Sequence, residues 1–280
     1  VGNAALFYNS TGYENTALGG SALLNNTDGY DNVSVGYRSS YSNQNGFKVV
    51  SIGAYANELN VTGTGITAVG FQALQNTTNS NNTAVGVYAS RLTTTGTYNV
   101  GLGNSALELN TTGSNNTALG AAALYNNTAS NNTAVGYYAG NANTTGIGIT
   151  AIGYQAGSSN TTSNGLTAVG YQALNSSTAI QNTAVGYQAG YVVSNGTSNT
   201  FMGSSTGAAT TTGSNNTAIG QASLLSNSTG SGNTALGKTA LQNNTASNNT
   251  AVGLEAGQAN TSGTGLTAIG YQALRVSTGN

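Results

Sequence analysis

The chain has 280 residues, a net charge of −1 and charged side chains at only 4% of its positions, and it contains no Cys, His, Trp or Pro. Without Cys and His, the usual ligands for zinc and haem and the thiol nucleophile are missing, and no basic patch for nucleic acid is present. No apolar run approaches the ~20 residues that span a bilayer.

A glycine preceded by an aliphatic residue recurs sixteen times, every 16 or 17 residues. Such a short, fixed period is typical of stacked repeat proteins. The repeat glycines are Gly19, Gly36, Gly53, Gly70, Gly86, Gly103, Gly120, Gly136, Gly153, Gly170, Gly186, Gly203, Gly220, Gly237, Gly253 and Gly270. We call each repeat a rung and number its residues from the glycine, which is position zero.

A short strand is predicted just before each glycine. Position −4 is Asn in eleven rungs, position −3 is Thr in thirteen and Val in three, and position −2 is small except at Phe201. Stacked Asn amides can form a hydrogen-bonded ladder, and Asn is also an ordinary turn residue. Position −1 is always aliphatic, which predicts an inward-facing core column. It comprises Leu18, Val35, Ile52, Val69, Val85, Leu102, Leu119, Val135, Ile152, Val169, Val185, Met202, Ile219, Leu236, Val252 and Ile269.

A second short strand is expected after the glycine. Position +3 is Ala in thirteen rungs, and position +4 is commonly Leu or Gly. The remaining residues of each rung are polar and turn-like, as in 110–116. We therefore predict that each rung consists of a strand, a corner at Gly, a second strand and a polar loop.

The predicted fold is all-β, a parallel β-solenoid or β-roll of about sixteen rungs with 16–17 residues each and under a tenth helix. Residues 1–280 form a single continuous repeat domain, which we expect to be a segment of a longer fibrous protein. A longer period of 50 residues separates every third glycine. Duplication of a three-rung unit explains it better than one turn of a three-sided helix.

The run Asn-Thr-Ala-Val-Gly at 182–186 and its variants resemble the head repeat of trimeric autotransporter adhesins. The longer phrase at 182–189 is similar to repeats of phage tail fibres. The resemblance covers residues 15–275 and implies a left-handed parallel β-roll assembled as a trimer. The rungs here are longer than the adhesin rung, and the extra residues fall in the polar loop.

Two sets of side chains are candidate surface sites. Aromatic residues at position +1 offer a column for stacking on sugars, or they pack at a corner or subunit contact; they are Tyr37, Phe71, Tyr137, Tyr154, Tyr171, Tyr187 and Tyr271. Asn-x-Ser/Thr motifs are candidate glycosylation sites, or they arise by chance from Asn- and Thr-rich turns. They include Asn60, Asn76, Asn110, Asn143, Asn160 and Asn260.

No catalytic, metal-binding or cofactor-binding residue is predicted. Six acids are scattered along the chain, and the pair Asp28 and Asp31 reads better as a solvated loop than as an acid–base site. Ser and Thr have no His partner, so a Ser-His-Asp triad is excluded. We therefore expect a non-enzyme without cofactors.

The expected function is a structural or adhesive extracellular fibre segment, such as a tail-fibre shaft, adhesin head or surface filament, on a cell or virion surface. Self-association as a trimer or filament and contact with surface glycans are the expected interactions, without nucleic acid or membrane insertion. The alternative is a ligand-binding solenoid face for glycans or ice. Ice binding would suit a Thr ladder, but the Thr column shares the aliphatic face and is therefore expected inside.

Overall fold

A computed structural model describes residues 1–276, in two compact units, of which the first is Val1–Tyr138 and the second begins at Ala139. Within that range the regular elements are short strands, and no helix occurs. The strands of the first unit are β1 (Thr16–Leu18), β2 (Val33–Val35), β3 (Val50–Ile52), β4 (Thr67–Val69), β5 (Thr83–Val85), β6 (Val100–Leu102), β7 (Thr117–Leu119) and β8 (Thr133–Val135).

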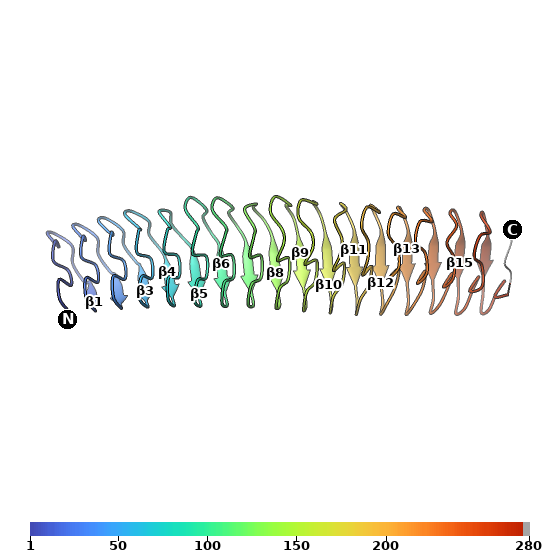
Figure 1. Cartoon of the computed structure of the whole chain (residues 1–280), viewed down its shortest axis with the longest axis horizontal. Helices are drawn as coiled ribbons and strands as arrows, with labels where there is room; N and C mark the ends of the chain where they lie inside the picture. Colours follow the sequence, from blue (N-terminus) through green and yellow to red (C-terminus); the bar gives the residue numbers. More distant parts are fainter. Residues whose placement is uncertain (277–280) are drawn as a thin grey trace. The chain divides into compact units, whose positions relative to one another are not determined.

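The second unit repeats this arrangement with eight further strands. They are β9 (Thr150–Ile152), β10 (Thr167–Val169), β11 (Thr183–Val185), β12 (Thr200–Met202), β13 (Thr217–Ile219), β14 (Thr234–Leu236), β15 (Thr250–Val252) and β16 (Thr267–Ile269). In each unit the arrows lie side by side and point the same way (Figure 1).

Neighbouring strands pair in parallel and in strict register. Thr183 pairs with Thr200, and Val185 with Met202, so equivalent positions of successive rungs form straight columns. The same register holds from β1 to β8 and from β9 to β16. The predicted parallel β-solenoid is therefore confirmed.

The second strand predicted after the glycine is wrong, because the return segment is a series of turns. Positions +2 and +4 have left-handed backbone, as at Gln172 with φ 53° and Leu174 with φ 45°. The segment still bonds from rung to rung; the Leu174 amide donates to the Ala189 carbonyl at 3.0 Å. The left-handed backbone explains why position +4 is so often Gly, which adopts it freely. Where Leu stands there, its burial offsets a strain of ~1–2 kcal/mol.

The strand faces are the reverse of those expected from the aliphatic column. Position −2 points inward: Ala168 and Ala184 are fully buried, while positions −3 and −1 on either side lie on the outside. In most rungs the return segment lies close to position −2, so only a small side chain fits there. Where Ser34 replaces Ala, its hydroxyl donates to the Ser39 carbonyl of that segment at 2.8 Å.

The predicted inward core column is therefore corrected to an outward one. Its members are partly or largely exposed; Leu18 is 51% exposed and Ile219 is 41% exposed. The column comprises Leu18, Val35, Ile52, Val69, Val85, Leu102, Leu119, Val135, Ile152, Val169, Val185, Met202, Ile219, Leu236, Val252 and Ile269. Strand alternation had correctly placed positions −3 and −1 together. The structure places this shared face outside, where the aliphatic pattern predicts it inside.

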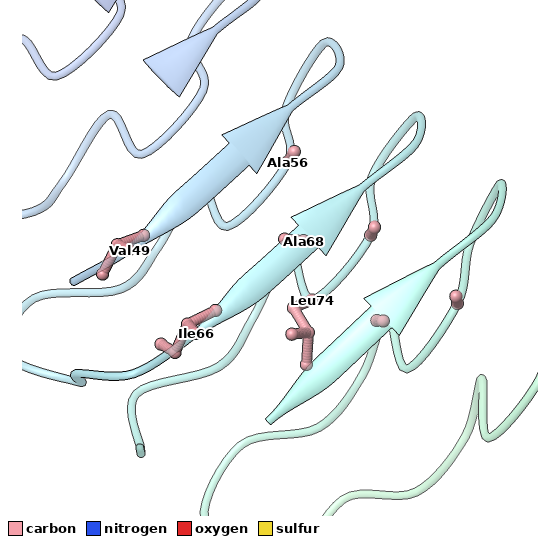
Figure 2. Packing of buried hydrophobic residues seen from close by; sticks show 8 residues of the cluster. Val49, Ala56, Ile66, Ala68 and Leu74 are labelled. Carbon is pink, nitrogen blue, oxygen red and sulfur yellow. The ribbon is translucent and has the colours of Figure 1, made fainter. Parts of the chain in front are cut away.

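The actual core consists of alanines with a few larger side chains between them. In the first unit Val49 and Ile66 at position −4 and Leu74 at position +4 pack with the alanines of the strands and return segments (Figure 2). In the second unit Phe201 replaces the usual Ala at position −2 and is fully buried. The glycines at position +4 of two rungs make room for it, since a Cβ at Gly190 would lie 2.9 Å from its ring.

The predicted Asn ladder is present inside the solenoid. The Asn199 side-chain amide donates to Asn182 Oδ1 at 3.1 Å, and the Asn216 amide donates to Asn199 Oδ1 at 3.1 Å. These side chains are buried, and each also donates to a loop carbonyl, as Asn199 does to Gly213 at 2.9 Å. The column therefore satisfies its buried amides by joining successive rungs.

The repeat glycines form the corners after the strands, with φ between 124° and 139°. This backbone conformation is rare for any residue with a side chain. At Gly186 an added Cβ would also lie 2.5 Å from the carbonyl oxygen of Gly203 in the next rung. Backbone conformation and close stacking both explain why the corner is always Gly.

Candidate functional site

The outer side of β9–β16 carries two parallel columns, which we call the Thr–aliphatic face. Position −3 supplies Thr150, Thr167, Thr183, Thr200, Thr217, Thr234, Thr250 and Thr267. Position −1 supplies Ile152, Val169, Val185, Met202, Ile219, Leu236, Val252 and Ile269. Every member is partly or fully exposed. The strand register therefore builds a regular surface of hydroxyl and methyl groups.

The threonine hydroxyls of this face have no hydrogen-bond partner within the described part of the chain, whereas loop threonines do bond to neighbouring rungs. The hydroxyl of Thr178, for example, donates to the Ser194 carbonyl at 2.6 Å. The three charged residues of the described part of the unit, Lys238, Glu255 and Arg275, lie at positions +1, +2 and +5 of their rungs. The face is thus uncharged, and its hydroxyls are available to a ligand.

The corresponding face of the first unit is less regular. Its strands carry Val33, Val50 and Val100 at position −3, so three of its eight rungs lack the hydroxyl. The complete Thr column belongs to β9–β16 alone. The second unit therefore presents the better candidate surface.

The predicted aromatic column is exposed across the glycine corner from the strand. Exposed fractions range from 38% at Phe71 to 70% at Tyr271, and the other members are Tyr37, Tyr137, Tyr154, Tyr171 and Tyr187. The rings of Tyr154, Tyr171 and Tyr187 are stacked almost in parallel, with centroids 5.1 Å and 5.2 Å apart. Beside them, Gln188 donates to Gln172, and Gln172 donates to Gln155.

The structure contains a second aromatic stack, which the sequence pattern at position +1 does not predict. Tyr13, Tyr30 and Phe47 lie in consecutive polar loops, with ring centroids 5.0 Å and 4.8 Å apart and ring planes within 3° of parallel. Their 17-residue spacing is the signal that could have revealed the stack. It was hidden because later rungs do not continue the column.

Most of the candidate glycosylation sites lie inside the solenoid. Asn60, Asn110, Asn143, Asn160 and Asn260 are fully buried. Their amides close a tight turn, as Asn60 does by donating to the Gly63 carbonyl at 3.0 Å and accepting from the Gly63 amide. A folded rung leaves no space for a glycan on these five residues, which corrects that expectation. Asn76 is partly exposed.

Four of the six acidic residues make hydrogen bonds or ion pairs within the solenoid. Asp28 and Asp31 are both exposed, and Asp28 accepts a hydrogen bond from the Thr11 hydroxyl at 2.6 Å. Glu108 is paired with Arg91 at 2.7 Å, and Glu255 with Arg275 at 3.1 Å. Over residues 1–276, no three acids, His or Cys are grouped as a metal site would require.

In the same part of the chain, no helix has the length and hydrophobicity needed to cross a bilayer. No family model matches the sequence, and neither a curated protein nor a solved structure is detectably similar to it. The Thr–aliphatic face and the aromatic column are therefore interpreted from their own chemistry.

Proposed function

We propose that this chain is a segment of a structural or adhesive extracellular fibre that acts by repetition and carries out no catalysis. The observation that carries the proposal is the strict register of the strands, which presents the same outward groups once per rung. Contacts that are weak in one rung add up when many rungs engage together. A tail-fibre shaft, an adhesin head or a surface filament would use such a surface.

The residue inventory supports a non-catalytic role. The chain has no His or Cys and only eleven charged side chains, and the buried Asn column joins rungs rather than lining a cavity. The resemblance to adhesin head repeats and tail fibres supports placement on a cell or virion surface. It also favours a trimer.

Glycan binding is a second candidate function, favoured by the aromatic column. The rings of Tyr154, Tyr171 and Tyr187 cover one another's faces, so they offer a row of exposed apolar edges, and the neighbouring glutamines offer amide hydrogen bonds. Sugar rings combine the same two kinds of group. Screening the protein on a glycan array, with Tyr171→Ala as the matched variant, tests this candidate.

Immunogold electron microscopy of the native cell or particle tests the fibre proposal. Antibodies against the chain should label projections on the outer surface at regular distances from their base. Labelling confined to the cell interior, or turnover of a polysaccharide by the purified protein, would overturn the proposal.

A further inference from the structure

The Thr–aliphatic face has a regularity that folding alone does not require. Its residues are on the outside, where many side chains would fit a strand equally well. Nevertheless, all eight rungs of the second unit keep Thr at position −3 and an aliphatic residue at position −1. Repeated exposed aliphatic side chains mark an interaction surface. The uniformity of the columns indicates a ligand that is itself periodic.

The spacing of the face is set by the backbone. Paired strands repeat at ~4.8 Å, and two residues along a strand span ~6.6 Å. The hydroxyl and aliphatic columns thus form a rectangular grid, held in register from β9 to β16. The exposed planes of an ice crystal likewise present oxygen atoms in regular rows, to which a regular grid of hydroxyls can bond.

The chemistry of the grid also suits water held in a lattice. The eight hydroxyls have no partner within the described residues of the chain, and each can donate and accept a hydrogen bond. The methyl groups between them cannot bond to water, so water over them is held by its own neighbours. Because the face carries no charged side chain, no water is held around an ionic group, where it would disturb the lattice arrangement of the neighbouring water.

Other ligands fit the grid less well. A second copy of this chain would cover the aliphatic column, but it would bury the hydroxyls, and each hydroxyl left unpaired costs ~1–3 kcal/mol. Nucleic acids and charged polymers find no complementary charge on the face. Sugar rings find apolar ring edges beside amide groups in the aromatic column across the corner.

From these observations we infer that the Thr–aliphatic face of β9–β16 binds ice. The inference rests on the proposed function, since it names a ligand for a repeated face of that fibre. Binding depends on many rungs fitting the lattice together, because a single rung contributes only weak contacts. A bulky group in the middle of the grid should therefore lift several rungs away from the crystal.

The test measures the gap between the melting and freezing temperatures of a single ice crystal in solutions of the whole chain, together with the crystal's shape. Thr217→Tyr places a ring at the middle of the face, and Tyr suits an exposed strand position. Thr229→Tyr places the same ring on an exposed polar loop and serves as the matched control. Far-UV spectra and melting curves verify that both variants are folded.

We expect the wild-type chain and Thr229→Tyr to shape ice crystals and open the gap equally, and Thr217→Tyr to narrow it several-fold. Absence of any gap or crystal shaping, or equal activity of the two variants, would refute ice binding. A wild-type oligomer that Thr217→Tyr dissociates, without ice activity, would instead identify the face as a contact between copies. Neither negative result affects the immunogold test of the fibre.

Discussion

Two adjacent residues of β11 offer a direct test of which strand face is inside. Ala184 is fully buried between Ala168 and Phe201 of the neighbouring strands, whereas Val185 lies on the outer face. We therefore expect Ala184→Asp to disrupt the local rungs and Val185→Asp to be tolerated. The aliphatic column alone would predict the opposite order.

The size of the difference follows from burial. Keeping an Asp neutral at pH 7, against an ordinary pKa of ~3.9, costs ~4 kcal/mol, and an unpaired buried carboxyl adds ~1–3 kcal/mol. Ala184→Asp should thus lower the free energy of unfolding by about 5–7 kcal/mol. Val185→Asp loses about half the burial of one Val and some strand preference, or ~1–2 kcal/mol.

Guanidinium unfolding measures both losses, and hydrogen exchange locates them in the rungs around β11. Ala184→Ser is the matched control, because Ser already stands at this position in β2 and β3 and bonds to the return segment. It should cost little. If Val185→Asp destabilises as much as Ala184→Asp, the assignment of the faces is refuted.

Three further variants test the glycine corner, the buried Asn ladder and the independence of successive rungs in the second unit. Gly186→Ala should cost ~2–4 kcal/mol in denaturant unfolding, because the new Cβ meets the next rung in a conformation that strains it. Asn199→Ala should cost ~2–3 kcal/mol by leaving ladder partners unpaired, whereas the exposed Asn195→Ala should change stability by under ~0.5 kcal/mol. Deleting 171–220 removes three whole rungs and should shorten the unit by ~14 Å in small-angle scattering while preserving the β spectrum. A corner that accepts Ala, equal losses for the two Asn variants, or collapse of the deletion variant would contradict these expectations in turn.

Periodicity made the solenoid predictable, because every rung must bond to the next with the same backbone geometry. The Asn ladder followed from the same logic. Hydrophobicity did not predict which face of each strand points into the solenoid. Ala168 is less apolar than Val169, and yet Ala168 is the buried residue because its side chain is small enough for the interior. Size at position −2 was the better guide than apolar character at position −1.

The return segment and the candidate surface were harder to predict for a related reason. Leu174 and Gln172 look compatible with a strand, but both adopt left-handed backbone, which the Gly residues in equivalent positions of other rungs could have indicated. The Thr column shares its strand face with the aliphatic column, which predicts the inside of a stack, so the sequence places the Thr hydroxyls inside whereas the structure exposes them. The buried sequons were missed because Asn60 closes a turn within the core, although its motif is common in exposed loops.

Complementary sizes inside the stack also affect how such a gene can lengthen. Gly157 leaves room for Leu166, which immediately precedes β10, and Gly190 leaves room for Leu174 and Phe201. Inserting a single rung would therefore bring two bulky residues together or leave a void. A duplication of 50 residues, the longer period of the sequence, keeps most neighbours matched. Viable length variants should consequently differ by whole three-rung steps, so that the length of the solenoid changes in discrete increments under recombination.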